Sequence, residues 1–231
     1  MTLFLTHVPK TAGTSMRKAV FEPSISESGI HSFSGIRRAL TRRVEFDLLA
    51  GHYPYGVHKL YEVDTPQYFV MLRDPIDRAI SQYYFTKMAD TDWYSHPGLE
   101  DVKTNDLTDF YRTPTRQNLQ ARYVAGLEWE WVGRHISLNG LLGSLVLKRA
   151  KGNLLQTYEA FGLKERFQES ARLFGSRLGA VPELPDKRHK KTRERPSKDD
   201  LSDAVLHQLR ELNSLDIALY ECAQAHFDTQ K

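Results

Sequence analysis

Cysteine is almost absent from the sequence. Cys222 is the single one among 231 residues, so an internal disulfide framework is excluded and a reducing compartment is favoured. No apolar run reaches the length of a membrane span, and no charged segment followed by an apolar one marks a secretory signal. We therefore expect a cytoplasmic protein without a transmembrane segment.

Excess charge of either sign is also small. The formal net charge is +3, with 26% charged and 40% hydrophobic residues, the composition of an ordinary globular protein. This charge gives no reason to expect nucleic acid as a partner, although the isoelectric point near 8.9 suits an anionic ligand. At this length we expect one domain, covering residues 1–231.

A Walker A loop is missing as well. That motif needs a glycine, four residues and then Gly-Lys-Ser/Thr, whereas here a lysine precedes the only glycine of the first loop. The apolar, β-prone run 2–8 predicts a strand, and residues 16–21 predict a helix. The loop between them supplies one charge, several short donors and a glycine: Lys10, Thr11, Ala12, Gly13, Thr14 and Ser15.

Such a strand, loop and helix start can bind an anion. The free N–H groups of the first helical turn and the positive end of the helix dipole face the loop. We expect the anion to be a phosphate. Taken alone, the loop is equally compatible with a βα turn in which Gly13 only relieves backbone strain.

Strands and helices alternate along the chain. The predicted strands are 2–8, 46–50, 67–72 and 154–161. The predicted helices are 16–21, 76–88, 107–111, 116–125, 138–151 and 163–173, with the terminal helices within 201–227, and residues 91–105 are expected to form a surface loop. This alternation predicts an α/β fold, a single domain with a central parallel β-sheet flanked by helices. Catalytic groups should collect at the carboxyl ends of the strands.

A second motif, Arg73-Asp74-Pro75, follows the strand predicted at 67–72 and opens a helix. Its aspartate is a good N-cap and its proline a good first helical residue. Arg78 and Ser81 lie three residues apart on one helix face, so they can present a guanidinium and a hydroxyl to one phosphate. Taken alone, this motif is better interpreted as a capped helix with a salt-bridged arginine.

Both motifs in this order resemble the paired 5′- and 3′-phosphate motifs of sulfotransferases that use 3′-phosphoadenosine 5′-phosphosulfate (PAPS). The resemblance is closest to the branch that contains heparan and chondroitin 2-O-sulfotransferases and their bacterial relatives, and segments 51–56, 118–123 and 161–167 are similar to it too. It implies a P-loop-like sulfotransferase fold, PAPS as co-substrate, no metal, and a hydroxyl acceptor, with a saccharide or polysaccharide favoured. Golgi sulfotransferases carry an N-terminal anchor, so we expect a bacterial-type or trimmed enzyme.

The resemblance also implies roles for single residues. Lys10 would contact the 5′-phosphosulfate and its bridging oxygen within the cradle 11–15, and Arg73 and Ser81 would hold the 3′-phosphate. Negative charge grows on the departing phosphate as the S–O bond breaks. A fixed ammonium and a helix start would therefore stabilise the transition state.

His52 is the candidate general base. It follows a predicted strand and a glycine, which should put it at the carboxyl edge of the sheet, and it matches the histidine that acts as base in the 2-O-sulfotransferase branch. The alternative is a histidine that only hydrogen-bonds backbone in a glycine-rich turn. His58 is a second candidate, and His7 is expected to be structural or to support the loop.

The acceptor site is expected to include Tyr53, Arg116 and Arg122 beside the base, although both arginines could equally lie on a solvated helix face. Sulfotransferases close a late basic loop over the 3′-phosphate. We therefore expect one or two residues of the run 187–193 to contact the cofactor, and the remaining charges to form a flexible surface loop. The candidates are Lys190, Lys191 and Arg193.

Two other functions stay open. A nucleotide-dependent kinase on a related phosphate-binding fold is disfavoured by the missing Walker A order and by the missing Walker B aspartate. A non-catalytic module that binds a nucleotide or an anionic glycan would need neither Lys10 nor His52. The loops that select an acceptor are short here, so the sequence says more about the donor than about the acceptor.

Overall fold

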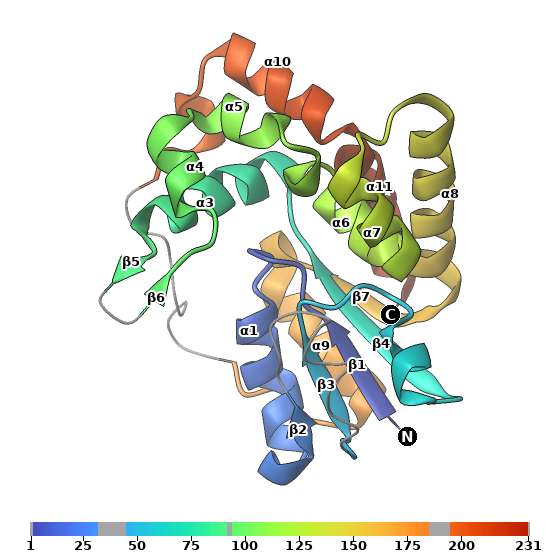
Figure 1. Ribbon diagram of the computed structural model, residues 1–231. Helices are drawn as coiled ribbons and strands as arrows, with labels where there is room; N and C mark the ends of the chain where they lie inside the picture. The colour runs from blue at the N-terminus through green and yellow to red at the C-terminus, as the bar shows by residue number, and fades with distance from the viewer. Residues whose placement is uncertain (1, 32–44, 92–93, 185–194, 231) are drawn as a thin grey trace.

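The computed structural model describes residues 2–31, 45–91, 94–184 and 195–230 (Figure 1). Its central sheet has five parallel strands in the order β2-β3-β1-β4-β7. These are β1 (Thr2–Thr6), β2 (Ile30–His31), β3 (Leu48–Gly51), β4 (Pro66–Leu72) and β7 (Tyr158–Leu163). Because all five strands run the same way, their carboxyl ends meet at one edge of the sheet.

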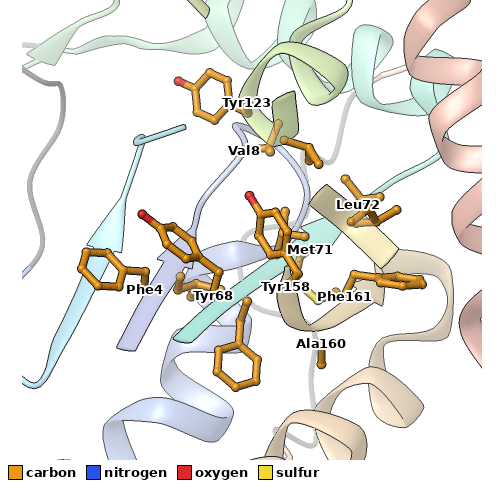
Figure 2. Packing of buried hydrophobic residues seen from close by; sticks show 14 of the residues in the cluster. Phe4, Val8, Tyr68, Met71, Leu72, Tyr123, Tyr158, Ala160 and Phe161 are labelled. Atoms are coloured by element: carbon orange, nitrogen blue, oxygen red, sulfur yellow. The ribbon is translucent and has the colours of Figure 1, made fainter. Parts of the chain in front are cut away.

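Aromatic side chains alternate between the two faces of β4, as the period of a strand requires. On one face Phe69 packs edge-on against Phe21 and Phe174, with ring centroids 5.3 and 5.1 Å apart. On the other face Tyr68 lies between Phe4, at 4.9 Å, and Tyr158, at 5.6 Å (Figure 2). Both faces are therefore covered, which is typical of a parallel sheet.

Two helical segments cover the face of the sheet on which Phe69 lies. Phe21 ends a helical segment that starts as α1 (Gly13–Met16) and continues as a π-helix (Arg17–Phe21), and Phe174 belongs to α9 (Phe167–Leu178). The remaining helices are α3 (Pro75–Met88), α4 (Leu99–Thr104), α5 (Leu107–Arg112), α6 (Leu119–Ala125), α7 (Leu127–His135), α8 (Gly140–Gln156), α10 (Asp203–Leu212) and α11 (Ser214–His226).

A second, smaller apolar cluster lies apart from the sheet. Helices α3, α4, α5 and α10 enclose it around Ile80, Phe110 and Leu209. Figure 1 shows this helical group beyond the carboxyl edge of the sheet, where β4 leads into α3. The loops at this edge of the sheet therefore face these helices.

The sequence-based prediction of an α/β domain with a parallel central sheet is confirmed. Asp74 caps α3 as predicted, because its carboxylate accepts a hydrogen bond of 2.8 Å from the backbone N–H of Asp77. Ser197 and Asp200 form the expected capping box, on a short 3₁₀ segment. None of the helices in the described ranges has the length and the apolar character that crossing a bilayer demands.

Three predicted boundaries are wrong. The strand expected at 154–161 begins only at Tyr158, because Leu154 shares a buried helical face with Val146 and Ala150 and extends α8. The helix expected at 163–173 begins only at Phe167, because β7 continues to Leu163. The loop expected at 91–105 contains part of an antiparallel pair, β5 (Asp90–Thr91) with β6 (Tyr94–Ser95), and the helix α4.

Candidate functional site

The loop after β1 has an unusual backbone. Lys10 and Ala12 both have φ near +69°, on either side of Thr11, whose buried hydroxyl donates to the carbonyl oxygen of Val8 at 2.8 Å. Left-handed backbone costs a residue with a side chain about 1–2 kcal/mol. Alternation of right- and left-handed residues turns successive N–H groups toward one point and forms an anion-binding concavity. Strain of this kind is typical of functional loops.

The helix that follows begins with uncapped N–H groups. Ala12 occupies the N-cap position and provides no side-chain hydrogen bond, and Thr14 and Ser15 lie partly exposed in the first turn. A Cβ atom on Gly13 would lie 2.1 Å from Cδ2 of His7, so only glycine lets the helix start approach this imidazole. Gly13 is therefore needed because no side chain fits beside His7, and not only because glycine is flexible.

His52 lies next to this loop, directly after β3. Its Nδ1 is 2.7 Å from the carbonyl oxygen of His7, and the two imidazole centroids are 4.7 Å apart. A carbonyl oxygen can only accept, so Nδ1 carries the proton and Nε2 holds the lone pair. Burial lowers the pKa of His52 from its ordinary 6.5, partly opposed by this hydrogen bond. His52 is therefore neutral and basic at Nε2 near pH 7.

The imidazole of His7 is held even more firmly in the neutral form. Burial lowers its pKa to about 3, with further contributions from the neighbouring His52, Arg17 and Lys10. Arg17 and Lys10 make the surroundings of the loop positive. His58, the second candidate base, instead hydrogen-bonds the hydroxyl of Tyr68 through Nδ1, at 3.0 Å.

The two predicted phosphate motifs meet at Arg73. Its Nη1 donates to the carbonyl oxygen of Lys10 at 2.8 Å, while Nε and Nη2 donate to the carboxylate of Asp77. The backbone N–H and C=O of Arg73 both bond the side-chain amide of Gln120, each at 2.9 Å. This arginine is thus fixed in place from three directions.

Asp77 is the centre of a cluster of cations. Besides Arg73, it accepts from Nη2 of Arg195 at 2.7 Å, and Nζ of Lys164 lies 3.4 Å away. Burial raises the pKa of Asp77, but the pairing with Arg73 and Arg195 outweighs burial and brings the pKa down to about 2. The carboxylate of Glu165 also interacts with Arg73 and Lys164, so three cations face two carboxylates, and the remaining positive charge favours a further anion here.

The residues predicted to bind the cofactor are only partly brought together. Lys10 lies beside α3, with Nζ 3.9 Å from the ring centroid of Phe85, and Ser81 on the same helix is only 3% exposed. The predicted contacts at Lys190, Lys191 and Arg193 lie outside the described residues. Arg195 and Lys164 were not predicted as site residues, although Arg195 lies two residues after the basic run 187–193 and Lys164 lies in the segment 161–167 that resembles the 2-O-sulfotransferase branch.

A cavity of about 280 Å³ adjoins the loop at Pro9. Arg78 lines it, is 1% exposed, and has two guanidinium nitrogens, Nε and Nη2, that find no hydrogen-bond partner among the described residues. Nη2 lies 3.8 Å from the carboxylate of Asp216. Arg116 borders the same cavity, with its guanidinium 3.9 Å from the ring centroid of Phe110. Phe110 is 2% exposed beneath Arg116, and each cation at the cavity has a carboxylate partner, Asp216 for Arg78 and Asp101 for Arg116.

Two residues predicted at the acceptor site are buried in the packing around it. Arg122 is 1% exposed and donates to the carboxylate of Glu130 at 2.9 and 2.6 Å, and to four backbone carbonyl oxygens. It joins α6 to α7 and the segment before them. Tyr53 is 2% exposed and belongs to the main apolar core. Both side chains are therefore engaged in packing rather than in ligand contacts.

Comparison with known proteins found no family model that matches the chain and no curated protein with significant similarity to it. The likeness to sulfotransferases therefore rests on the motif residues, their order and their positions in this fold.

Proposed function

We propose that the protein is a sulfotransferase that moves a sulfuryl group from PAPS to a hydroxyl of a saccharide. One observation carries the proposal. The hydrogen bond between Arg73 Nη1 and the carbonyl oxygen of Lys10 joins the two predicted phosphate motifs at the carboxyl edge of the sheet. Because β1 and β4 are neighbours in the sheet, the loops after them lie side by side, and this bond fixes the guanidinium of Arg73 on the loop of Lys10.

The donor is proposed to bind across this junction. The N–H groups of the loop and helix start, with Lys10, suit the 5′-phosphosulfate. Arg73, Arg195 and Lys164 suit the 3′-phosphate, whose charge would compete with Asp77 for the three cations. Contact with the 3′-phosphate would distinguish PAPS from ordinary adenine nucleotides.

The chemistry follows from the tautomer of His52. Nε2 accepts the proton of the acceptor hydroxyl as that oxygen attacks sulfur, and a new O–S bond forms. The bond between sulfur and the bridging phosphate oxygen breaks, and its electron pair stays on the phosphate. The ammonium of Lys10 and the N–H groups of the loop stabilise this charge. The products are a sulfate ester and 3′-phosphoadenosine 5′-phosphate.

The acceptor is proposed to occupy the cavity beside Pro9. Nε of Arg78, which has no hydrogen-bond partner among the described residues, would bind a polar or anionic group of the acceptor, and Arg116 would border it. An acidic saccharide matches this combination. The single cysteine further favours action in the cytoplasm.

Transfer of radiolabelled sulfate from PAPS to a panel of neutral and acidic polysaccharides tests the proposal. Wild type should label an acidic polysaccharide, and Lys10→Ala should lower the rate by about 10²–10³-fold. Lys18→Ala, an exposed lysine of the same helical segment, should keep the wild-type rate. Transfer of phosphate from magnesium ATP, without any sulfate transfer, would overturn the proposal in favour of a kinase.

A further inference from the structure

Large apolar side chains are exposed on two consecutive helices, α7 and α8, and on the residues between them. Their exposed fractions range from 39% to 78%, far above those of the core. They are Trp131 at 67%, Ile136 at 45%, Leu141 at 78%, Leu142 at 39%, Leu145 at 44% and Leu155 at 42%. We call this set the α7–α8 apolar surface. A patch of this kind on a globular protein marks an interaction site.

The fold fixes the direction of these side chains. Helix α8 buries Val146, Ala150 and Leu154 and packs against α6 and α11, so the helical period turns Leu141 and Leu145 to the opposite side. A Cβ atom on Gly143 would lie 2.7 Å from a backbone carbonyl oxygen, which leaves α8 no room to rotate. Figure 1 shows α8 along the outer edge of the molecule, where nothing in the described chain covers this side.

From Trp131 onward this part of the chain carries positive charge without negative charge, and the exposed Glu128 lies one turn before it on α7. Residues 131–158 contain no aspartate and no glutamate, although the whole chain has 29 acidic residues. Lys148 and Arg149 are exposed one turn after Leu145 and continue its face of the helix. Apolar side chains followed by cations on one exposed face are typical of helices that lie on anionic bilayers.

We propose that the α7–α8 apolar surface binds an anionic membrane surface, with the leucines and Trp131 entering the headgroup region and Lys148 and Arg149 facing lipid phosphates. A second copy of the chain matches less well. Pairing this surface with itself would oppose cations to cations, and residues 131–158 offer no carboxylate in return. A soluble polyanion would satisfy the charges but would leave Leu141 in water.

Flotation with vesicles tests the proposal on the full chain. Vesicles of phosphatidylcholine with phosphatidylserine should carry wild type upward, and vesicles of phosphatidylcholine alone should not. Leu141→Ser with Leu145→Ser, and separately Lys148→Glu with Arg149→Glu, should each lower bound protein about tenfold. Val181→Ser, which removes an 88% exposed apolar residue elsewhere, should bind like wild type. Circular dichroism checks that each variant is folded.

Two results would overturn the proposal. One is the absence of binding to anionic vesicles at low salt, or binding that both double variants retain. The other is a concentration-dependent dimer in light scattering that Leu141→Ser with Leu145→Ser abolishes, because the surface would then join two copies. Neither result bears on sulfate transfer, so the membrane proposal can fail while the proposed activity stands.

Discussion

His7 and His52 follow neighbouring strands and share one hydrogen bond, yet their surroundings give them different tasks. The carbonyl oxygen of His7 sets the tautomer of His52, and the half-buried His7 ring packs on the glycine that opens the first helix. His52 was identifiable from sequence because it belongs to a contiguous motif. Its tautomer was not, because it depends on a residue 45 positions away.

Replacing the proposed base should change both the rate and its dependence on pH. Burial lowers the pKa of His52 below 6.5, so the wild-type rate should stay high at pH 7 and fall only on the acid side of pH 6.5. His52→Ala should lower kcat by about 10²–10⁴-fold and remove this acid limb. The measurement is the initial rate of sulfate transfer across pH.

The matched control is His58→Ala, whose imidazole bonds Tyr68 rather than facing the loop. It should keep the wild-type pH profile. A His52→Ala variant with the wild-type rate would remove His52 from the mechanism.

His7 should make the protein less stable in mild acid. Its pKa is about 3 in the folded protein and 6.5 in the unfolded chain. Below pH 6.5 the unfolded chain therefore binds a proton at His7 that the folded protein does not bind. Stability therefore falls as pH drops from 6.5 toward 3. His7→Gln should reduce this slope by about one proton, which is about 1.4 kcal/mol per pH unit.

Urea unfolding between pH 7 and pH 5 measures this slope. The exposed His207→Gln provides the control and should keep the wild-type slope. Equal slopes in His7→Gln and wild type would show that His7 is not the buried neutral group described here.

Among the elements, the junction of β4 with α3 organises the charge of the site. Asp77 lies in the first turn of α3 and gathers Arg73 from the strand end, Lys164 after β7 and Arg195 before α10. The order Arg-Asp-Pro predicted the cap and the helix start correctly. It could not predict Lys164 or Arg195, which lie 87 and 118 residues from their shared partner.

Removing this carboxylate should have opposite effects on stability and on binding. With a pKa of about 2, Asp77 contributes fully above pH 3.8, and its contribution is lost as pH falls toward 2. At pH 7, Asp77→Asn should lower the free energy of unfolding of the ligand-free protein by about 1–2 kcal/mol. The three freed cations should bind 3′-phosphoadenosine 5′-phosphate more tightly.

Thermal unfolding with and without this nucleotide measures both effects. Asp109→Asn, which alters an exposed pair with Arg112, should change neither. Weaker nucleotide binding by Asp77→Asn would contradict the assignment of this cluster to the 3′-phosphate.

The pairing of Arg122 with Glu130 should matter for stability. Both side chains are nearly inaccessible, so Arg122→Met would leave a buried carboxylate without its main partner. We expect a loss of about 3–5 kcal/mol in urea unfolding, against a small change for the exposed Arg112→Met. A loss below about 1 kcal/mol would return Arg122 to the list of ligand-binding candidates.

At the scale of the whole molecule, the alternation of apolar strands and helices predicted the parallel sheet and the edge where the motifs meet. The order of the strands was not readable, and β2 was not predicted because it has only two residues. The helix α7 was missed because Trp131 and Ile136, on and directly after it, are exposed and blur its apolar period. Sequence therefore predicted the sheet better than its helical surroundings.

The most direct test of the proposed function needs no knowledge of the acceptor. It is calorimetric titration of the protein with 3′-phosphoadenosine 5′-phosphate, ADP and 5′-AMP, each with and without magnesium. We predict tight binding of 3′-phosphoadenosine 5′-phosphate that does not depend on magnesium and that is lost with the 3′-phosphate. Equal or tighter binding of ADP, above all with magnesium, would contradict the sulfotransferase assignment and favour a kinase.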